Sequence, residues 1–168
     1  MKQNLLHRNL QQLILGTIVV LTVGVFAIQA DAQQAGGRPA SSSADQLFKS
    51  ITRVQMKSIM DSEGFSVTPD DDGDLVWKID GFKSFLFVAK DETSIQFHAS
   101  FKSDNTTVRK VNEWNRTMRY SKTYLDSDGD PHLELDLDLA GGVTRARIID
   151  FLKTCTLSFG NWKKQVVE

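Results

Sequence analysis

The chain has 168 residues, of which 20 are basic and 21 acidic, so its formal net charge at pH 7 is −1. This balance argues against a nucleic-acid-binding protein, because such proteins usually carry a clear basic excess. The single cysteine, Cys155, excludes an intrachain disulfide, so the fold must depend on packing.

The first 32 residues have the features of an export signal. Lys2 and Arg8 form a short basic region, and Leu13–Ile28 is an uncharged, mostly apolar run of 16 residues. Small residues at Ala30 and Ala32 then suit a signal peptidase. The run is shorter than the ~20 residues that a membrane-spanning helix needs. We predict a signal peptide over residues 1–32, cleaved after Ala32, and a periplasmic or secreted protein; a retained N-terminal membrane anchor is the alternative.

The remaining 136 residues suit one domain with one core. Residues 33–43 are rich in Gly, Pro and Ser, which predicts a flexible spacer ahead of a domain over residues 44–168. Apolar residues at helical spacing then predict a helix over residues 44–63, with Gly64 as its stop. The stripe consists of Leu47, Phe48, Ile51, Val54 and Ile59.

An antiparallel meander follows the first helix, because the apolar period changes to two. The alternation predicts strands over residues 65–68, 75–79, 82–90 and 95–101. Asp and Gly residues between these strands favour tight turns, and Asp80-Gly81 is typical of a hairpin. The strand over residues 82–90 has apolar residues on both faces, which predicts a central position.

The second half of the chain contains two further helices and a second hairpin. The pattern predicts a helix over residues 108–118 with Trp114 in the core, and strands over residues 119–125 and 132–139 around an acidic turn. Gly141-Gly142 ends the last strand. The resulting order, αβββ(β)αββα, defines an α+β fold: an antiparallel meander sheet with flanking helices.

A final helix is predicted over residues 143–166, with an apolar seam at heptad spacing. We expect the seam to pack across its own sheet, with Cys155 as a small buried residue. A contact with a second subunit, or an intermolecular disulfide through Cys155, is the alternative. The seam consists of Ile148, Leu152, Cys155, Phe159, Trp162 and Val166.

No residue pattern predicts catalysis or a cofactor. The acidic turn that starts at Asp126 fails the calcium-loop pattern, because Pro131 and Leu137 stand where Gly and Glu are required. His98 and His132 fall on outward positions of strands, and two histidines alone do not make a metal site. The usual nucleophile, zinc and phosphate-loop motifs are missing from the sequence.

The most distinctive polar feature is the outward face of the strand over residues 132–139. Glu134, Asp136 and Asp138 alternate there with leucines, and such a row of carboxylates needs basic neighbours. Lys122 on the preceding strand is the predicted partner, with Lys78, Lys83 and Lys102 on the meander. The face is either a solvated surface with cross-strand pairs or an acidic patch that binds a basic partner or ligand.

Several segments together resemble the YbjN domain family, small bacterial proteins described as sensory-transduction regulators. The most specific are VNEWNR at residues 111–116 and the run from Asp128 to Val143, DGDPHLELDLDLAGGV. Shorter matches lie at residues 70–74, 79–81 and 94–97. The resemblance spans residues 47–166 and implies a fold like that of type III secretion chaperones, often dimeric. It carries over no catalytic residues.

These observations predict an exported, non-enzymatic binding module for a protein or peptide partner in the cell envelope, with a regulatory or chaperone-like role. Glu134, Asp136 and Asp138 are the candidate partner-binding residues. We expect no cofactor, no metal and no nucleic acid, and membrane contact only if the N-terminal segment is uncleaved. A homodimer is compatible with the sequence. The alternative is a periplasmic protein that binds a small ligand or metal through the acidic strand face.

Overall fold

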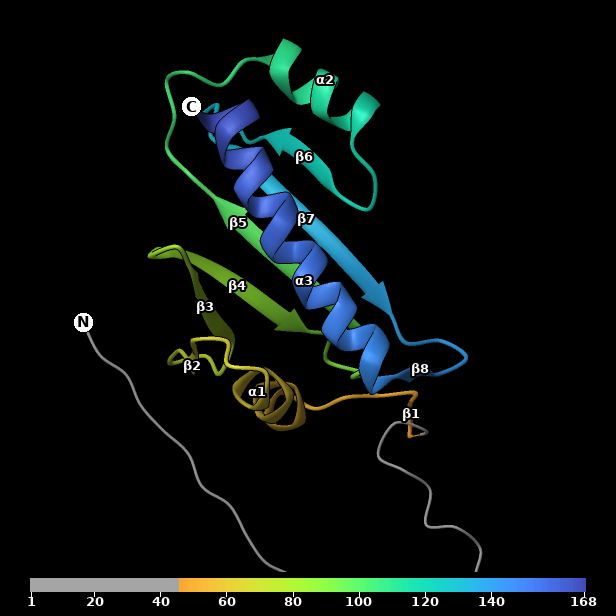
Figure 1. Cartoon of the computed structure of the whole chain (residues 1–168). Coiled ribbons are helices and arrows are strands. Elements are labelled where there is room, and N and C mark those ends of the chain that lie inside the picture. The colour runs from red at the N-terminus through yellow and green to blue at the C-terminus, as the bar shows by residue number, and fades with distance from the viewer. Residues whose placement is uncertain (1–45) are drawn as a thin grey trace, which may run out of the picture. The chain divides into compact units, whose positions relative to one another are not determined.

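The structure is a computed structural model that describes residues 46–168 (Figure 1). The predicted signal peptide and spacer therefore lie outside the described residues. The helices are α1 (Arg53–Ser62), α2 (Val108–Thr117) and α3 (Arg145–Trp162), and a π-helical turn, η1 (Lys163–Val167), continues α3. The strands are β1 (Leu47–Phe48), β2 (Val67–Pro69), β3 (Leu75–Ile79), β4 (Phe82–Val88), β5 (Ser94–Ser100), β6 (Lys122–Leu125), β7 (Pro131–Asp138) and β8 (Val143–Thr144).

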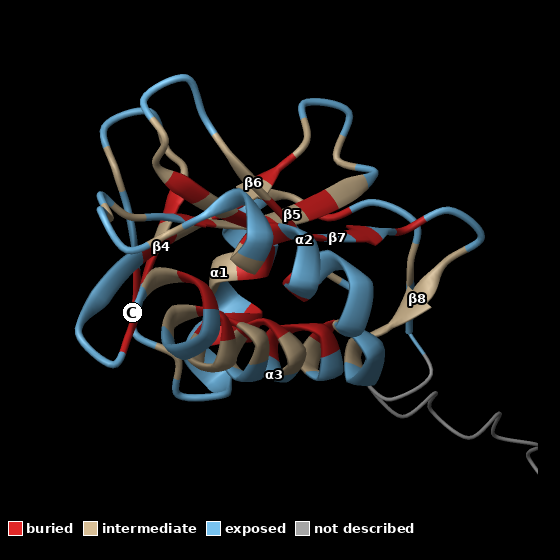
Figure 2. Cartoon of the chain, turned by 90° about the horizontal axis from the view of Figure 1, so that it is seen from above, coloured by how far each residue is buried: buried red, intermediate tan, exposed pale blue. Residues whose placement is uncertain are grey.

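Six of these strands form one antiparallel sheet in the order β2-β3-β4-β5-β7-β6. Strand β4 has a strand on each side, as its apolar residues on both faces predict. The three helices of the described region lie on one side of the sheet, so the other face has no helix over it (Figure 2). This arrangement confirms the predicted α+β fold.

The core lies between the sheet and α3. All six residues of the α3 seam are buried at 0% exposure. The Phe97 and Phe159 rings meet edge to face at 6.2 Å, and Trp162 Nε1 donates to Thr123 Oγ1 at 2.8 Å. The regular seam is therefore the internal contact between α3 and the sheet, which leaves it no surface to offer a second subunit. The predictions for Cys155 and Trp114 as core residues are confirmed.

The first helix is shorter than predicted, and the prediction that it begins at residue 44 is wrong. Thr52 caps the helix by accepting from the Gln55 N–H, and the Gln55 side chain accepts from the Thr52 N–H. This capping box fixes the helix start, because it satisfies N–H groups that lack a partner within the helix. Leu47 and Phe48 instead pair with β8, and Val54 is 79% exposed.

The ends of several other elements also differ from the prediction. Strand β2 begins at Val67, and β6 begins at Lys122 because the chain turns sharply at Tyr120, whose φ is +65°. Helix α3 begins two residues later than predicted, since Val143 and Thr144 form β8. A Cβ at Gly142 would lie 3.3 Å from Leu47 Cβ, so glycine permits the close approach of β1 and β8.

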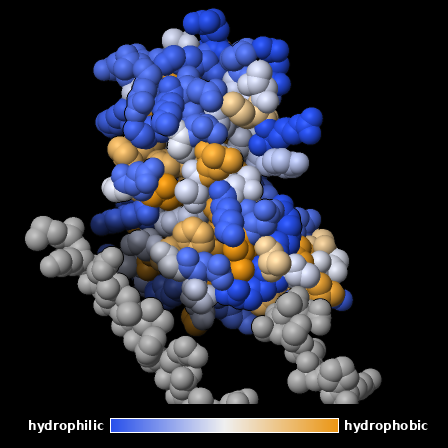
Figure 3. All heavy atoms as spheres, in the orientation of Figure 1, coloured by the Kyte–Doolittle hydropathy of each residue, from blue (hydrophilic) through white to orange (hydrophobic). Residues whose placement is uncertain are grey.

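The surface on the helix side shows apolar side chains as separate spots among polar ones (Figure 3). Within residues 46–168, no helix combines the length and apolarity needed to cross a membrane.

A free strand edge as candidate protein-binding site

Strand β7 is longer than its neighbour β6, and this difference leaves part of the sheet edge open. Strand β6 pairs with β7 from Pro131 to Glu134, whereas β5 pairs with β7 on the other side as far as Asp138. Among the described strands, none pairs with residues 135–138 on the β6 side. In Figure 1 this open stretch is the lower half of β7, beyond the point where β6 begins at Lys122.

The backbone groups of Asp136 and Asp138 face this open edge. In an antiparallel sheet, successive residues direct their N–H and C=O groups to opposite neighbours. The Leu139 N–H donates to the Thr93 carbonyl and the Pro131 carbonyl accepts from Phe101, so the odd-numbered residues of β7 face β5. The even-numbered residues therefore face β6 or, beyond Glu134, the open edge.

Helix α2 covers the outer edge of β6 but stops short of the free part of β7. The Asn115 side chain donates to the Thr123 carbonyl at 2.9 Å and accepts from the Thr123 N–H at 3.0 Å. Trp114 Nε1 donates to Ser121 Oγ at 3.0 Å and holds the loop between α2 and β6. These contacts explain two residues of the VNEWNR segment, and they leave residues 135–138 as the open stretch on this side of the sheet.

A hollow of about 540 Å³ lies beside the free edge. It lies between β7 and α3, with the exposed ring of Tyr120 at its side. Arg147 and Asp150 form an ion pair at 2.9 Å within it. Its walls thus combine apolar and polar groups, as in sites that hold a peptide side chain. The lining residues are Tyr120, Leu135, Asp136, Arg147, Asp150, Phe151 and Thr154.

The three predicted binding carboxylates share one face of β7 but differ in environment. Glu134 is nearly buried, at 9% exposure. Lys122 Nζ lies 2.6 Å from its Oε2, which confirms the predicted cross-strand pair, and the Tyr124 hydroxyl donates to its Oε1 at 2.7 Å. Burial opposes the ionised form, but these two hydrogen bonds outweigh it and lower the Glu134 pKa. The Glu134 charge is therefore neutralised within the fold.

The charges of Asp136 and Asp138 are not neutralised in this way. Both side chains are exposed. Asp136 Oδ1 accepts from Gln96 Nε2 at 2.8 Å, and Asp138 Oδ1 accepts from the Ala140 N–H at 2.8 Å. Within residues 46–168, neither carboxylate has a basic side chain within ion-pair distance. The patch available to a partner thus consists of Asp136 and Asp138 beside the free edge.

The two histidines of the open face form a hydrogen-bonded pair. His98 Nε2 lies 2.9 Å from His132 Nδ1, and His132 Nε2 lies 3.1 Å from Asp126 Oδ2. Burial, and then the nearby His132, lower the pKa of His98, while Glu134 partly opposes the shift. The described residues contain no group of three or more His, Cys, Asp or Glu side chains placed to hold a metal ion.

The acidic turn that resembled a calcium loop is organised by its own side chain. Asp126 Oδ1 accepts from the N–H groups of Asp128 and Asp130, at 2.9 Å each. The turn joins β6 and β7 as a hairpin, as Asp-Gly between alternating strands predicts.

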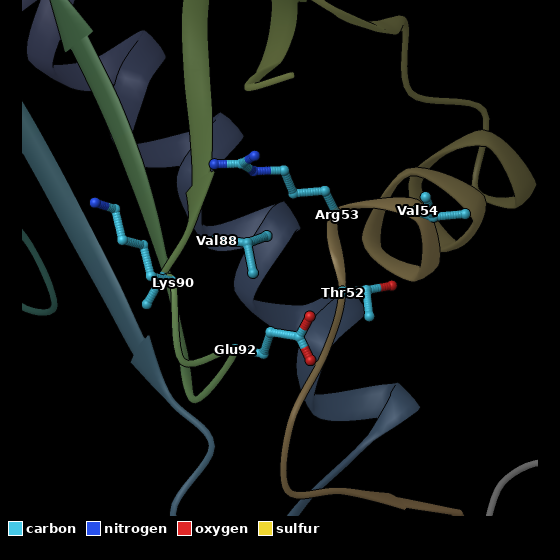
Figure 4. A pocket seen from close by; sticks show the side chains of 7 residues that line it. Thr52, Arg53, Val54, Val88, Lys90 and Glu92 are labelled. Carbon is cyan, nitrogen blue, oxygen red and sulfur yellow. The ribbon is translucent and has the colours of Figure 1, made fainter. Parts of the chain in front are cut away.

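A second hollow, of about 400 Å³, lies between the start of α1 and the end of β4 (Figure 4). Arg53, Lys90 and Glu92 contribute charges of both signs to it. Arg53 is paired with Asp74 at 3.2 Å, and the Glu92 carbonyl accepts from the Ile51 N–H. These contacts stabilise the fold at the first helix.

Comparison with known proteins assigns the family. The sequence model of the YbjN family, described as "Putative bacterial sensory transduction regulator", matches residues 52–158. The chain therefore belongs to the YbjN family, as its sequence motifs predicted. No curated protein matches the sequence.

Solved structures share the fold at low sequence identity. YbjN from E. coli has a TM-score of 0.51 and 16% identity, covering 66% of this chain and 93% of its own. A chain of the ExsC-ExsE complex has a TM-score of 0.52 and 15% identity, with coverages of 68% and 92%. The Yersinia pestis type III secretion chaperone SycH, in complex with a YscM2 fragment, has a TM-score of 0.46 and 11% identity, covering 61% of this chain and 92% of its own. The fold of this chain thus resembles those of E. coli YbjN and of the chain in the ExsC-ExsE complex.

Proposed function

We propose that this protein is a non-enzymatic binding module that captures an extended segment of a partner protein along the free edge of β7. The observation that carries the proposal is the unpaired stretch at residues 135–138 with a hollow beside it. An extended peptide gains affinity at such an edge by completing the sheet hydrogen bonds, and it gains specificity from side-chain pockets.

The family and the fold support a protein partner rather than a substrate. The family description names a regulator, and a chain of similar fold occurs in the ExsC-ExsE complex. The N-terminal sequence supports a location outside the cytoplasm. It has a basic region, an apolar run and then Ala30-Asp31-Ala32, which together support export. We therefore propose that the protein acts in the cell envelope, in a regulatory or chaperone-like role.

A proline substitution that removes one backbone N–H donor from the β7 edge tests whether peptides bind there. Binders are first selected from a library of displayed peptides against the protein as the cell processes it. Asp136→Pro removes an N–H that faces the open edge, and edge strands tolerate proline. Asp136→Asn changes the charge and keeps the N–H. We expect Asp136→Pro to weaken the selected binders much more than Asp136→Asn does.

Asp138→Pro repeats the test at the other free N–H, and circular dichroism checks that each variant is folded. A folded Asp136→Pro protein that binds selected peptides as well as the unchanged chain would contradict capture at this edge. Failure to select any extended peptide would also count against the proposal.

A further inference from the structure

We propose that the captured segment carries two basic residues separated by one apolar residue, with the basic side chains opposite Asp136 and Asp138. This inference rests on the proposed function and specifies the partner at the same edge. It follows from the register that a strand must take beside β7, from the charges on the open face, and from the position of the hollow.

The register fixes which partner side chains share a face with which residues of β7. Directly opposite residues on neighbouring strands project to the same face of a sheet, and their Cβ atoms lie about 5 Å apart. Partner residues opposite Asp136 and Asp138 therefore lie on the open face, two positions apart. The partner residue between them, opposite Leu137, projects to the helix side. Leu137 is 6% exposed and belongs to the core.

The charges of the open face favour basic side chains at the two outer positions. Asp136 and Asp138 are exposed and have no basic neighbour within ion-pair distance among residues 46–168. Lys122, the nearest cation on β6, is already bound to Glu134 at 2.6 Å. Opposite charges directly across a strand pair are favourable and like charges are unfavourable. An acidic segment is therefore disfavoured at this edge.

The helix side of the edge favours an apolar residue in the middle position, because the buried core residue Leu137 lies opposite it. The hollow lies on the same side beside Leu135, so it faces the next partner residue on the helix side, opposite Leu135. Leu135 and Phe151 line the hollow and are 1% and 3% exposed, so they form its apolar floor. Tyr120 is 76% exposed beside it and offers a further ring for contact. Three charged residues line the hollow. Arg147 and Asp150 are bound to each other at 2.9 Å, and Asp136 has no ion-pair partner among residues 46–168. The free stretch of four residues corresponds to about 13 Å of strand, which accommodates the three-residue pattern.

The test compares short labelled peptides that differ only at these positions. One carries Lys-Val-Lys in a Ser/Thr background, one carries Glu-Val-Glu, and one has the composition of the first in the order Lys-Lys-Val. Fluorescence anisotropy measures their binding to the processed protein. We expect the Lys-Val-Lys peptide to bind about tenfold tighter than either of the others, from two favourable cross-strand pairs.

Matched variants of the protein separate the effect of the Asp136 and Asp138 charges on peptide binding from the effect of the net charge of the protein. The double variant Asp136→Asn, Asp138→Asn should remove the preference for Lys-Val-Lys. The double variant Asp71→Asn, Asp72→Asn, in the turn between β2 and β3, changes the net charge equally and should keep the preference. Equal loss in both double variants would overturn the inference, since binding would then follow overall charge.

The outcomes distinguish this inference from the proposed function. If the peptides that bind at the edge are acidic, or bind equally well with and without lysines, the basic pattern is wrong and strand capture stands. If no peptide binds and Asp136→Pro changes nothing in the selected binders, strand capture itself is wrong. Tight, selective binding of Lys-Val-Lys that depends on Asp136 and Asp138 supports both.

Discussion

The Asn115 side chain pairs with both backbone groups of Thr123 and so takes the place of a further strand at the edge of β6. It donates to the Thr123 carbonyl at 2.9 Å and accepts from its N–H at 3.0 Å. Thr123 is 2% exposed, so water cannot easily replace these contacts. This arrangement closes one part of the sheet edge and leaves the second half of β7 as the open part.

Asn115→Ala should destabilise the protein substantially. The change leaves a buried N–H and a buried C=O of Thr123 unpaired, which costs about 2 kcal/mol. Urea unfolding measures the free energy of unfolding. Asn112→Ala is the control, because Asn112 is exposed on the same helix. Equal stabilities of the two variants would show that the Asn115 contacts do not hold the edge.

The pair between Glu134 and Lys122 should make stability depend on pH in the acidic range. The folded-state pKa of Glu134 lies below its usual value of 4.5, so its stabilisation is present above pH 4.5 and is lost as pH falls through the folded value. Glu134→Gln should therefore be less stable than the unchanged protein at neutral pH, and the difference should shrink in acid. Urea midpoints across this pH range test it. Glu113→Gln, at an exposed pair on α2, should show a much smaller dependence.

His98 should remain neutral below the pH at which an ordinary histidine is protonated. Burial and the neighbouring His132 lower its pKa below 6.5, so the unfolded state takes up the proton first. The stability linked to His98 is present above pH 6.5 and is lost as pH falls towards the lower folded value. Titration of the imidazole resonances by NMR measures both histidines. His132→Asn should raise the His98 pKa, and an unchanged value would contradict the coupling.

Cys155 should be inert in the folded protein. It is fully buried in the α3 seam, and burial raises the pKa of its thiol, so little thiolate is present to react. A thiol reagent should label it only at the rate of unfolding, and completely in denaturant. Rapid labelling of the native protein, or a disulfide-linked dimer on a non-reducing gel, would contradict this account.

The alternation and the helical spacing of apolar residues predicted the layers of this fold, because both patterns reflect which residues are buried. The leucines of β7 and the α3 seam are core residues, and the pair between Lys122 and Glu134 follows from two adjacent alternating strands. The start of α1 could not be derived from spacing alone. Leu47 and Phe48 fit the helical stripe, but β8, almost a hundred residues later, pairs with them.

The candidate site was only partly predictable. Glu134, Asp136 and Asp138 share a face, as predicted. The sequence did not show that, of these three carboxylates, Glu134 is the one that Lys122 and Tyr124 bind. The free edge was missed because the strand before the hairpin is predicted to begin at residue 119, which in this register would pair β7 as far as Leu137. The turn at Tyr120 shortens β6, and non-glycine residues with positive φ carry little signal in a sequence. The proposal that the carboxylates bind a partner stays a prediction.

Amide hydrogen exchange in a complex with a selected peptide tests capture at the β7 edge most directly. The amides of Asp136 and Asp138 face the open edge, whereas those of Leu135 and Leu137 are already bonded within the sheet. We predict that binding slows exchange at Asp136 and Asp138 by about tenfold or more and leaves Leu135 and Leu137 little changed. A saturated complex in which Asp136 and Asp138 exchange as fast as in the free protein would contradict capture along this edge.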